Sequence, residues 1–429
     1  MLDSTLDVLA DQGFGYITVE AVAQRAGVTR PVIYDTFGDL ESLLLALIDR
    51  GDQRVSGQLA EILGPGVPAD ADPDEFLIER ISMFLSAVRA DPRHWRLALM
   101  PPPGTSQELN FRLQRVRAEI AGHLRALLEW GLSVRGGPHG IDLEMAARLF
   151  VAVGEDAARL MLAHPRRFRP ERLANATVDL LALFPAGSTV GAQPPERPEI
   201  PAPVLQPAHG ASVNGAVSTA VAAPRKRVPQ AERREQLLDV ALELVAEQGF
   251  DSLSVEGIAR RAGVNRVVIY RSFSNLGVLI ATLMHREDLR VRSTLRGLIP
   301  QDPVAAVASG ISPREVLYDA LHHLLSAVAE RPLTWSVALL RPESAPRALQ
   351  RIVNRRRAAL AKRIEPLIAW VLASKEPEPP AYHVEAMARM LLTVGEEQAR
   401  LALTEQDAFP PARLLRGTWR LLEALDLPE

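Results

Sequence analysis

The sequence contains no cysteine, and this absence removes several kinds of chemistry at once. Without thiols the chain cannot form disulfides, hold zinc or an iron–sulfur cluster through cysteine, or use a thiol nucleophile. It also lacks an apolar run near the roughly 20 residues that a membrane-spanning helix needs. The N-terminus is acidic and amphipathic, unlike a secretory signal. We therefore expect a soluble, cytoplasmic protein.

Runs of alternating β-branched and polar residues, the signature of strands, are also missing. Apolar residues instead recur at helical spacing, as in Leu238, Ala241, Leu242 and Val245, which share one helix face. With 429 residues, of which 47% are hydrophobic, the chain has enough material for two or more cores. The predicted fold class is all-α.

Charge is distributed unevenly, although the net charge is only −3. Residues 224–286 carry 10 basic and 7 acidic side chains, a balance of +3, whereas residues 1–50 carry 3 Arg and 8 acidic side chains, a balance of −5. Because phosphate attracts basic surfaces, these two regions differ as partners for a nucleic acid.

What the sequence does contain is a duplication. The segment from Gly13 to Phe37 aligns without a gap to the segment from Gly249 to Phe273, and 14 of the 25 positions are identical. The likeness continues to residues 144–162 and 385–403, so each half is one long repeat. Residues 185–224 lie between the halves, hold 8 Pro, and are predicted to be a flexible linker.

Within the duplicated segment, a short helix is expected on each side of a glycine, Gly27 in the first copy and Gly263 in the second. Thr29 and Asn265 are placed to cap the second helix. Two short helices across a glycine turn predict a helix-turn-helix (HTH), although a purely structural helical hairpin would share this pattern.

The order Gly-Phe, then T/S-V-E-x-I/V-A-x-R-A-G-V-x-R-x-x-I-Y-x-x-F, resembles the TetR family of transcriptional regulators. The chain then looks like two such subunits fused in tandem, packed as an intrachain pseudo-dimer. The resemblance implies five domains: an HTH domain at 1–50, a helical regulatory domain at 51–184, the linker at 185–224, a second HTH domain at 225–286, and a second regulatory domain at 287–429.

The resemblance also implies which residues contact double-stranded DNA, expected to be a pseudo-palindromic operator. Tyr34 and Tyr270 resemble a recognition-helix tyrosine that contacts backbone phosphate. Other positions that resemble DNA contacts are Thr29, Arg30, Asn265, Arg266 and Arg271. The basic run Arg225, Lys226 and Arg227 resembles an arm that precedes the first helix.

Two departures from the family pattern weaken the DNA contacts. A lysine often found three residues after the motif phenylalanine is replaced by Leu40 and Leu276. The first copy also lacks the basic arm and has Asp35 where the second copy has Arg271. Because an acidic side chain repels phosphate, the second copy is predicted to bind DNA better.

The regulatory domains are expected to bind an unknown small-molecule effector. Aromatic and histidine side chains that could line its site, or simply fill the core, are Trp95, His123, Trp130, Trp335 and Trp370. Gly154 and Gly395, in matching G-E-x-x-A-R strings, are predicted to allow close helix approach at the pseudo-dimer interface. No metal or cofactor is expected, because the histidines lack a second ligand at helical spacing.

The leading hypothesis is a ligand-responsive transcriptional regulator, a repressor that binds DNA as a single chain. The alternative is a protein-interaction or ligand-sequestering module whose first HTH is vestigial. An enzyme is not expected, since the sequence has no nucleophile elbow, phosphate loop or metal-ligand spacing.

Overall fold

The computed structural model is helical, and the part of the chain that it describes contains no strand, so the predicted all-α class is confirmed. It describes residues 1–12, 17–64, 66–68, 71–100, 107–184, 229–250, 253–300, 302–339, 347–373 and 381–427. The segment predicted to be a linker lies outside these residues.

Residues 1–184 form what we call the first half, and residues 229–427 the second half. The helices of the first half are Leu2–Gln12 (α1), Val19–Ala26 (α2), Arg30–Phe37 (α3), Leu40–Leu63 (α4), Pro73–Ala90 (α5), Pro92–Leu99 (α6), Gln107–Arg135 (α7), Leu143–Ala163 (α8) and Pro170–Ala182 (α9).

The helices of the second half follow a similar order. They are Gln230–Gln248 (α10), Val255–Arg261 (α11), Arg266–Ser272 (α12), Leu276–Leu298 (α13), Pro303–Ala308 (α14), Pro313–Glu330 (α15), Pro332–Ala338 (α16), Arg347–Ala373 (α17), Ala381–Thr404 (α18) and Pro411–Ala424 (α19). By length and composition no single described helix would cross a membrane; only α12 taken together with Leu276–Ala308, across a 60° bend, passes that test.

Proline and capping side chains fix where many of these helices begin. Helix α5 starts at Pro73, whose missing N–H costs nothing in the first turn, and the Asp72 carboxylate accepts hydrogen bonds from the next free amides. Helix α15 starts at Pro313 behind a capping box formed by Ser312 and Glu315. Local sequence thus determines the helix starts before any tertiary contact forms.

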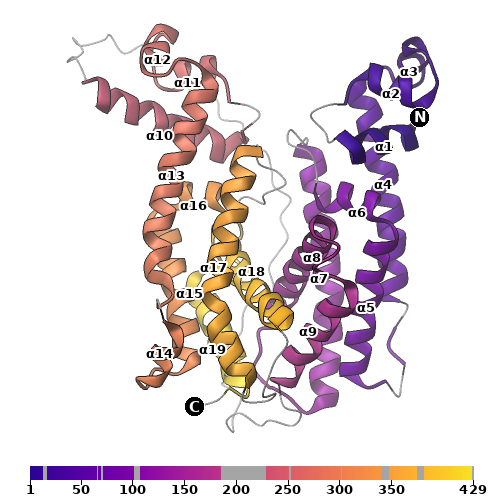
Figure 1. Ribbon diagram of the computed structural model, residues 1–429, viewed down its shortest axis with the longest axis vertical. Coiled ribbons are helices and arrows are strands. Elements are labelled where there is room, and N and C mark those ends of the chain that lie inside the picture. The colour runs from indigo at the N-terminus through magenta and orange to yellow at the C-terminus, as the bar shows by residue number, and fades with distance from the viewer. Residues whose placement is uncertain are drawn as a thin grey trace.

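The two halves stand side by side, and the short helices α2, α3, α11 and α12 all lie at one end of the molecule (Figure 1). The long helices α4 and α13 run from that end along the outer sides. Each is continuous through the domain boundary that we predicted, at residue 50 in α4 and at residue 286 in α13. The domain limits themselves stay a prediction.

The halves meet through α8 and α9 of the first half and α18 of the second. One continuous cluster of buried side chains draws on both halves, with Ala157, Ala158 and Met161 from α8 and Met387 and Ala388 from α18. Alanine on both facing surfaces lets the two helices approach closely. Apolar burial therefore joins the halves as well as filling each one.

Among the described glycines, Gly417 of α19 approaches the other half most closely. A Cβ at this position would lie 2.6 Å from Met145 Cε and 3.5 Å from Asp142 Cβ, both in the first half. Sequence reasoning missed this glycine, because its repeat counterpart is Ala176 and no local pattern distinguishes it.

We predict that Gly417→Leu lowers the free energy of unfolding by about 1–3 kcal/mol, since the new side chain must displace Met145 in a packed contact. The control is Gly122→Ala in α7, where a Cβ meets nothing within 4 Å. That change should raise stability by about 0.5–1 kcal/mol because helical glycine costs chain entropy. Urea unfolding measures both changes in stability. Equal changes for Gly417→Leu and Gly122→Ala would contradict the close approach of Gly417 to Met145.

Candidate nucleic-acid interface and ligand cavities

Both copies of the duplicated motif fold into two short helices across a left-handed glycine. Thr18 accepts a hydrogen bond from the Ala21 amide at 3.1 Å and begins α2. Gly27 follows that helix with φ 67°, and Gly263 has φ 61° in the second copy. A side chain at these two positions would be strained, so glycine is required for the turn. The predicted HTH geometry is present in both halves.

The helices α3 and α12 each bury one side and expose the other. Ile33 and Ile269 are almost fully buried under their own HTH. Tyr34 is 50% exposed and Tyr270 is 54% exposed, so neither tyrosine is a core residue. The surface that each recognition helix presents to solvent therefore carries a phenol group beside apolar and basic side chains.

An arginine at the start of each recognition helix is held by a glutamate of the preceding helix. The Arg266 guanidinium lies 2.8 Å from the Glu256 carboxylate, and that of Arg30 lies 3.2 Å from Glu20. All four side chains are more than half exposed, so each pair orients its arginine more than it stabilises the fold. The repeated ten-residue spacing of Glu and Arg was the signal that sequence reasoning overlooked.

The two HTHs differ in the side chains that cap their helices. The Asn265 side chain accepts from the Val267 amide at 3.0 Å, whereas Thr29 makes no such capping bond. The caps of α4 and α13 also differ, with Asp39 in the first half and neutral Asn275 in the second. Hydrogen bonds from Ser42, its backbone amide first, lower the pKa of Asp39, so it stays ionised.

A further charge difference is Asp35 against Arg271, both exposed. The first HTH thus carries two carboxylates, those of Asp35 and Asp39, where the second carries a cation and an amide. The predicted basic arm Arg225, Lys226 and Arg227 lies outside the described residues.

A cavity of about 300 Å³ lies within the first half; we call it cavity 1. Its walls are mostly apolar and come mainly from helices α4 to α8, with Leu181 of α9, Phe184, and Leu421 of α19 in the second half completing them. Trp95, packed edge-on against Phe84, and Trp130, packed edge-on against Phe76, both line it. A volume of this size with apolar walls suits a small hydrophobic ligand.

A second cavity of about 300 Å³, cavity 2, is lined by both halves. Trp335 and Leu324 line it from the second half, and Leu149 and Thr177 line it from the first. Five residues line both cavities, so the two sites are neighbours; these are Ala146, Phe150, Leu181, Phe184 and Leu421.

The other residues singled out from sequence lie elsewhere. His123 and Trp370 are absent from the described walls of both cavities. Gly154 lines cavity 1, and Gly395 lines cavity 2. A Cβ on either would first meet a side chain of its own half at 3.9 Å. Gly395 therefore faces a cavity that both halves line, and the interface role of the two glycines stays a prediction.

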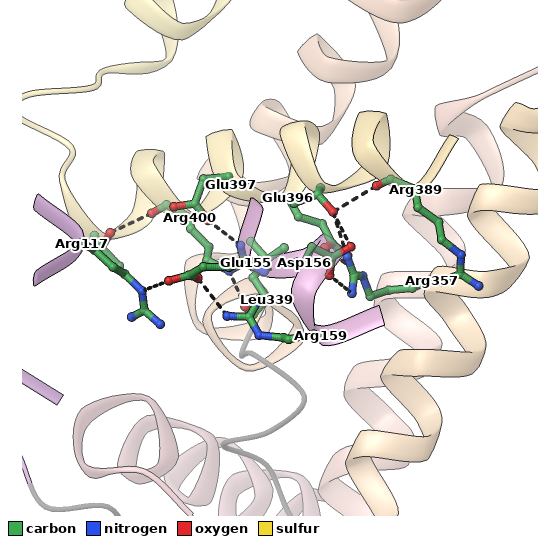
Figure 2. Close-up of polar contacts among 12 residues, drawn as sticks. Arg117, Glu155, Asp156, Arg159, Leu339, Arg357, Arg389, Glu396, Glu397 and Arg400 are labelled. Atoms are coloured by element: carbon green, nitrogen blue, oxygen red, sulfur yellow. Dashed lines mark hydrogen bonds and ion pairs between the residues drawn. The ribbon is translucent and has the colours of Figure 1, made fainter. Parts of the chain in front are cut away.

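Between the cavities lies a group of ion pairs that joins the halves (Figure 2). The buried Asp156 carboxylate of α8 accepts a hydrogen bond from Arg357 Nη1 of α17 at 2.9 Å and from Thr393 Oγ1 of α18 at 3.1 Å. Arg357 Nε also lies 3.0 Å from Glu396, whose repeat counterpart Glu155 pairs with Arg117 and Arg159 in the first half.

Opposing effects act on Asp156. Burial alone raises the pKa of this carboxyl group, but the charge of Arg357, its hydrogen bond and the contact with Thr393 outweigh burial, so the pKa lies below its usual value. A carboxyl group whose pKa is lowered by folding stabilises the protein fully above its unfolded pKa, and this stabilisation is lost as pH falls towards the folded pKa.

We predict that Asp156→Ala lowers the free energy of unfolding by about 1.5–3 kcal/mol at neutral pH, since it removes one of the two carboxylates that pair with the buried Arg357 and leaves Glu396 alone. The gap from wild type should narrow as pH falls below about 4, because the Asp156 carboxyl group then gains its proton in the unfolded chain before it does in the folded one. Urea unfolding across pH measures this.

The matched control is Glu119→Ala, which breaks the exposed pair with Arg115. It should cost no more than about 1 kcal/mol. An Asp156→Ala loss as small as this would show that the buried pair does not hold the halves together.

In a comparison with known proteins, both copies of the duplicated motif match one protein family. The model of "Bacterial regulatory proteins, tetR family" matches residues 1–47 and again residues 237–280. These two ranges contain the HTHs described above.

The chain is also similar to individual proteins. The "Fatty acid metabolism regulator protein" of Bacillus subtilis is 20% identical over 181 residues, which cover 42% of this chain and 91% of that protein. The "HTH-type transcriptional activator FasR" of Mycolicibacterium smegmatis is 37% identical over 73 residues, 17% of this chain and 33% of that protein. A solved TetR-like regulator from Rhodococcus sp. RHA1 matches 46% of this chain and 98% of its own, at 26% identity and a TM-score of 0.35.

The two family matches coincide with two HTHs of the same construction, each with an outward tyrosine and a tethered arginine. Both HTHs thus match the tetR family of bacterial regulatory proteins, and the relatives named above include a helix-turn-helix transcriptional regulator.

Proposed function

We propose that this chain is a ligand-responsive repressor that binds a pseudo-palindromic operator as a single-chain pseudo-dimer. The observation that carries the proposal is the position of the two HTHs at one end of a molecule whose halves are joined by α8 and α18 (Figure 1). Two recognition helices fixed in one body can occupy successive major grooves, about 34 Å apart, without a second chain.

Each cavity is connected to an HTH through one long helix. In the first half, Leu43 of α4 packs in the HTH core, and Val55 and Leu59 of the same helix line cavity 1. In the second half, Leu279 of α13 packs in the HTH core, and Leu295 lines cavity 2. A ligand that moves either helix would move its HTH, and the spacing would no longer fit the operator.

The effector we propose is a hydrophobic molecule with an acyl chain. Both cavities have mainly apolar walls, and their shared residues Phe150, Phe184 and Leu421 would allow contact with a long chain from either side. One of the relatives named above is a "Fatty acid metabolism regulator protein", which supports this class of effector.

Binding to DNA upstream of the protein's own coding region tests the function, by gel shift over a range of salt concentrations. We predict that Arg266→Ala weakens binding by about tenfold or more, a loss of about 1–3 kcal/mol. Arg30→Ala should weaken binding less, because Asp35 and Asp39 already disfavour phosphate beside the first HTH.

Equal losses from the two substitutions would contradict the asymmetry between the HTHs but not the repressor. If no promoter shows salt-sensitive, sequence-selective binding, the repressor proposal fails.

A cavity-filling substitution tests the response to ligand. Ala320 of α15 lines cavity 2. We predict that Ala320→Phe leaves operator binding within about twofold of wild type but abolishes release by saturated fatty acids or acyl thioesters, since the ring occupies the space of the ligand. The control is Ala329→Phe on an exposed face of the same helix. If the Ala320→Phe variant still releases DNA normally when ligand is added, cavity 2 has no role in the response to ligand.

The acidic first HTH also favours a second candidate function, a protein-interaction or ligand-sequestering module in which DNA binding is not the activity. Replacing Arg266 and Tyr270 together by alanine separates the two. Regulation in cells that survives this double change favours the module, and regulation that is lost favours the repressor.

A further inference from the structure

We propose that the interface between the halves is matched in charge, so that its ion pairs favour the first half against the second and disfavour either half against a copy of itself. The proposal rests on the single-chain pseudo-dimer and adds which partner each surface accepts. It is carried by four polar contacts around α8, α9, α18 and α19, which the two repeats do not share symmetrically.

The repeats give a direct correspondence at these contacts. With an offset of 241 residues, α8 aligns with α18 and α9 with α19. Asp142 then corresponds to His383, Asp179 to Arg420, and His164 to Glu405. The members of each corresponding pair differ in charge or in charge type. In a symmetric dimer of identical halves, the two positions of such a pair would instead carry the same residue.

At two of the contacts the observed pairing places an acidic side chain against an arginine or a histidine. Arg413 of α19 holds the Asp142 carboxylate with two hydrogen bonds, of 2.7 and 2.9 Å, and Glu144 at 2.8 Å. The two carboxylates raise the pKa of Arg413 well above its usual range, with the hydrogen bonds to Asp142 the largest cause. His383 of α18 contacts the Asp179 carboxylate of α9.

The other two contacts follow the same rule. Arg148 Nη2 donates to Glu405 Oε2 at 3.0 Å, and Arg167 Nε donates to Glu385 Oε2 at 2.9 Å. At least one partner in each of the four contacts is less than one quarter exposed, so solvent screens them less than it screens surface pairs.

Pairing of the first half with a copy of itself would place like charges together. In the same geometry, Asp142 would take the position of His383 and face Asp179 across the interface. His164 would take the position of Glu405, so Arg148 would lose its acidic partner. Both changes replace an attraction by a repulsion or an unpaired charge.

Pairing of the second half with itself fails in another way. His383 would take the position of Asp142 and face Arg413. Arg420 would take the position of Asp179 and approach His383 as well. Two arginines and a histidine would then meet without the carboxylates of Asp142 and Asp179, and only Glu385, in the position of Glu144, would remain beside Arg413.

The central pair does not discriminate. Asp156 with Arg357 crosses between the halves, and the repeat counterparts Glu397 and Arg117 keep the same charges. Either kind of pairing preserves this attraction. The centre of the interface thus holds any two halves together, while the four outer contacts select which two.

Substituting a residue by its own repeat counterpart tests this in the intact chain. His383→Asp places a carboxylate against Asp179, as in a self-pair of the first half. Asp179→Arg places a guanidinium against His383, as in a self-pair of the second half. The double variant again joins opposite charges. The control is Arg420→Asp, the same exchange at a position whose ion pair is with Glu423 of its own helix. We leave Asp142 unchanged because it also caps α8.

Equilibrium unfolding in urea and sedimentation are the measurements. Each single substitution at 179 or 383 should destabilise the chain and raise the unfolding equilibrium constant by about tenfold or more, equivalent to a loss of about 1.4 kcal/mol. The double variant should recover most of this loss, and Arg420→Asp should change the constant by less than about threefold. Wild type should sediment as a monomeric chain.

Single variants as stable as wild type, or a double variant as unstable as the sum of the singles, would overturn the matched interface. A wild-type chain that dimerises through self-paired halves would do the same. None of these measurements uses DNA. Failure of operator binding with intact charge coupling would therefore remove the repressor and leave the matched interface standing.

Discussion

The structure depends on the contact between α8 and α18, in which alanine-rich surfaces pack and one carboxylate is buried with its partners. Asp156 has no water to solvate it, so it is stable as an anion only while Arg357 and Thr393 are held in place. Because α8 and α17 also line the cavities, this requirement fixes the relative position of the two halves and the shape of both cavities together.

Duplication within one chain changes what an interface has to satisfy. In a dimer of identical subunits every contact occurs twice, so a residue must suit its own counterpart. Covalent linkage removes this condition, and the two surfaces can diverge. The chain keeps the Glu–Arg pairs of its HTHs in both halves, at Arg30 and Arg266, but has diverged at Asp142 and His383, where the halves face one another.

Much of the fold and part of the site followed from the sequence. Helical spacing and glycine turns predicted the all-α class, and the ends of α3 agree with prediction, because capping and turn chemistry are local. The HTH core and its exposed tyrosines followed from the repeated motif. The helical pattern could not show that Gly154 and Gly395 line cavities, since it places a glycine on a helix face but does not show what that face contacts.

By itself, the sequence determined the elements, the duplication, the position of each HTH and the charge difference between them. These properties depend on residues close together along the chain or on composition. Only the tertiary structure decided that Trp95 and Trp335 each line a cavity while His123 and Trp370 line neither, and that Gly417 lies against Met145. It also brought Asp156 to Arg357, 201 residues away, because packing of distant helices decides which buried charges meet.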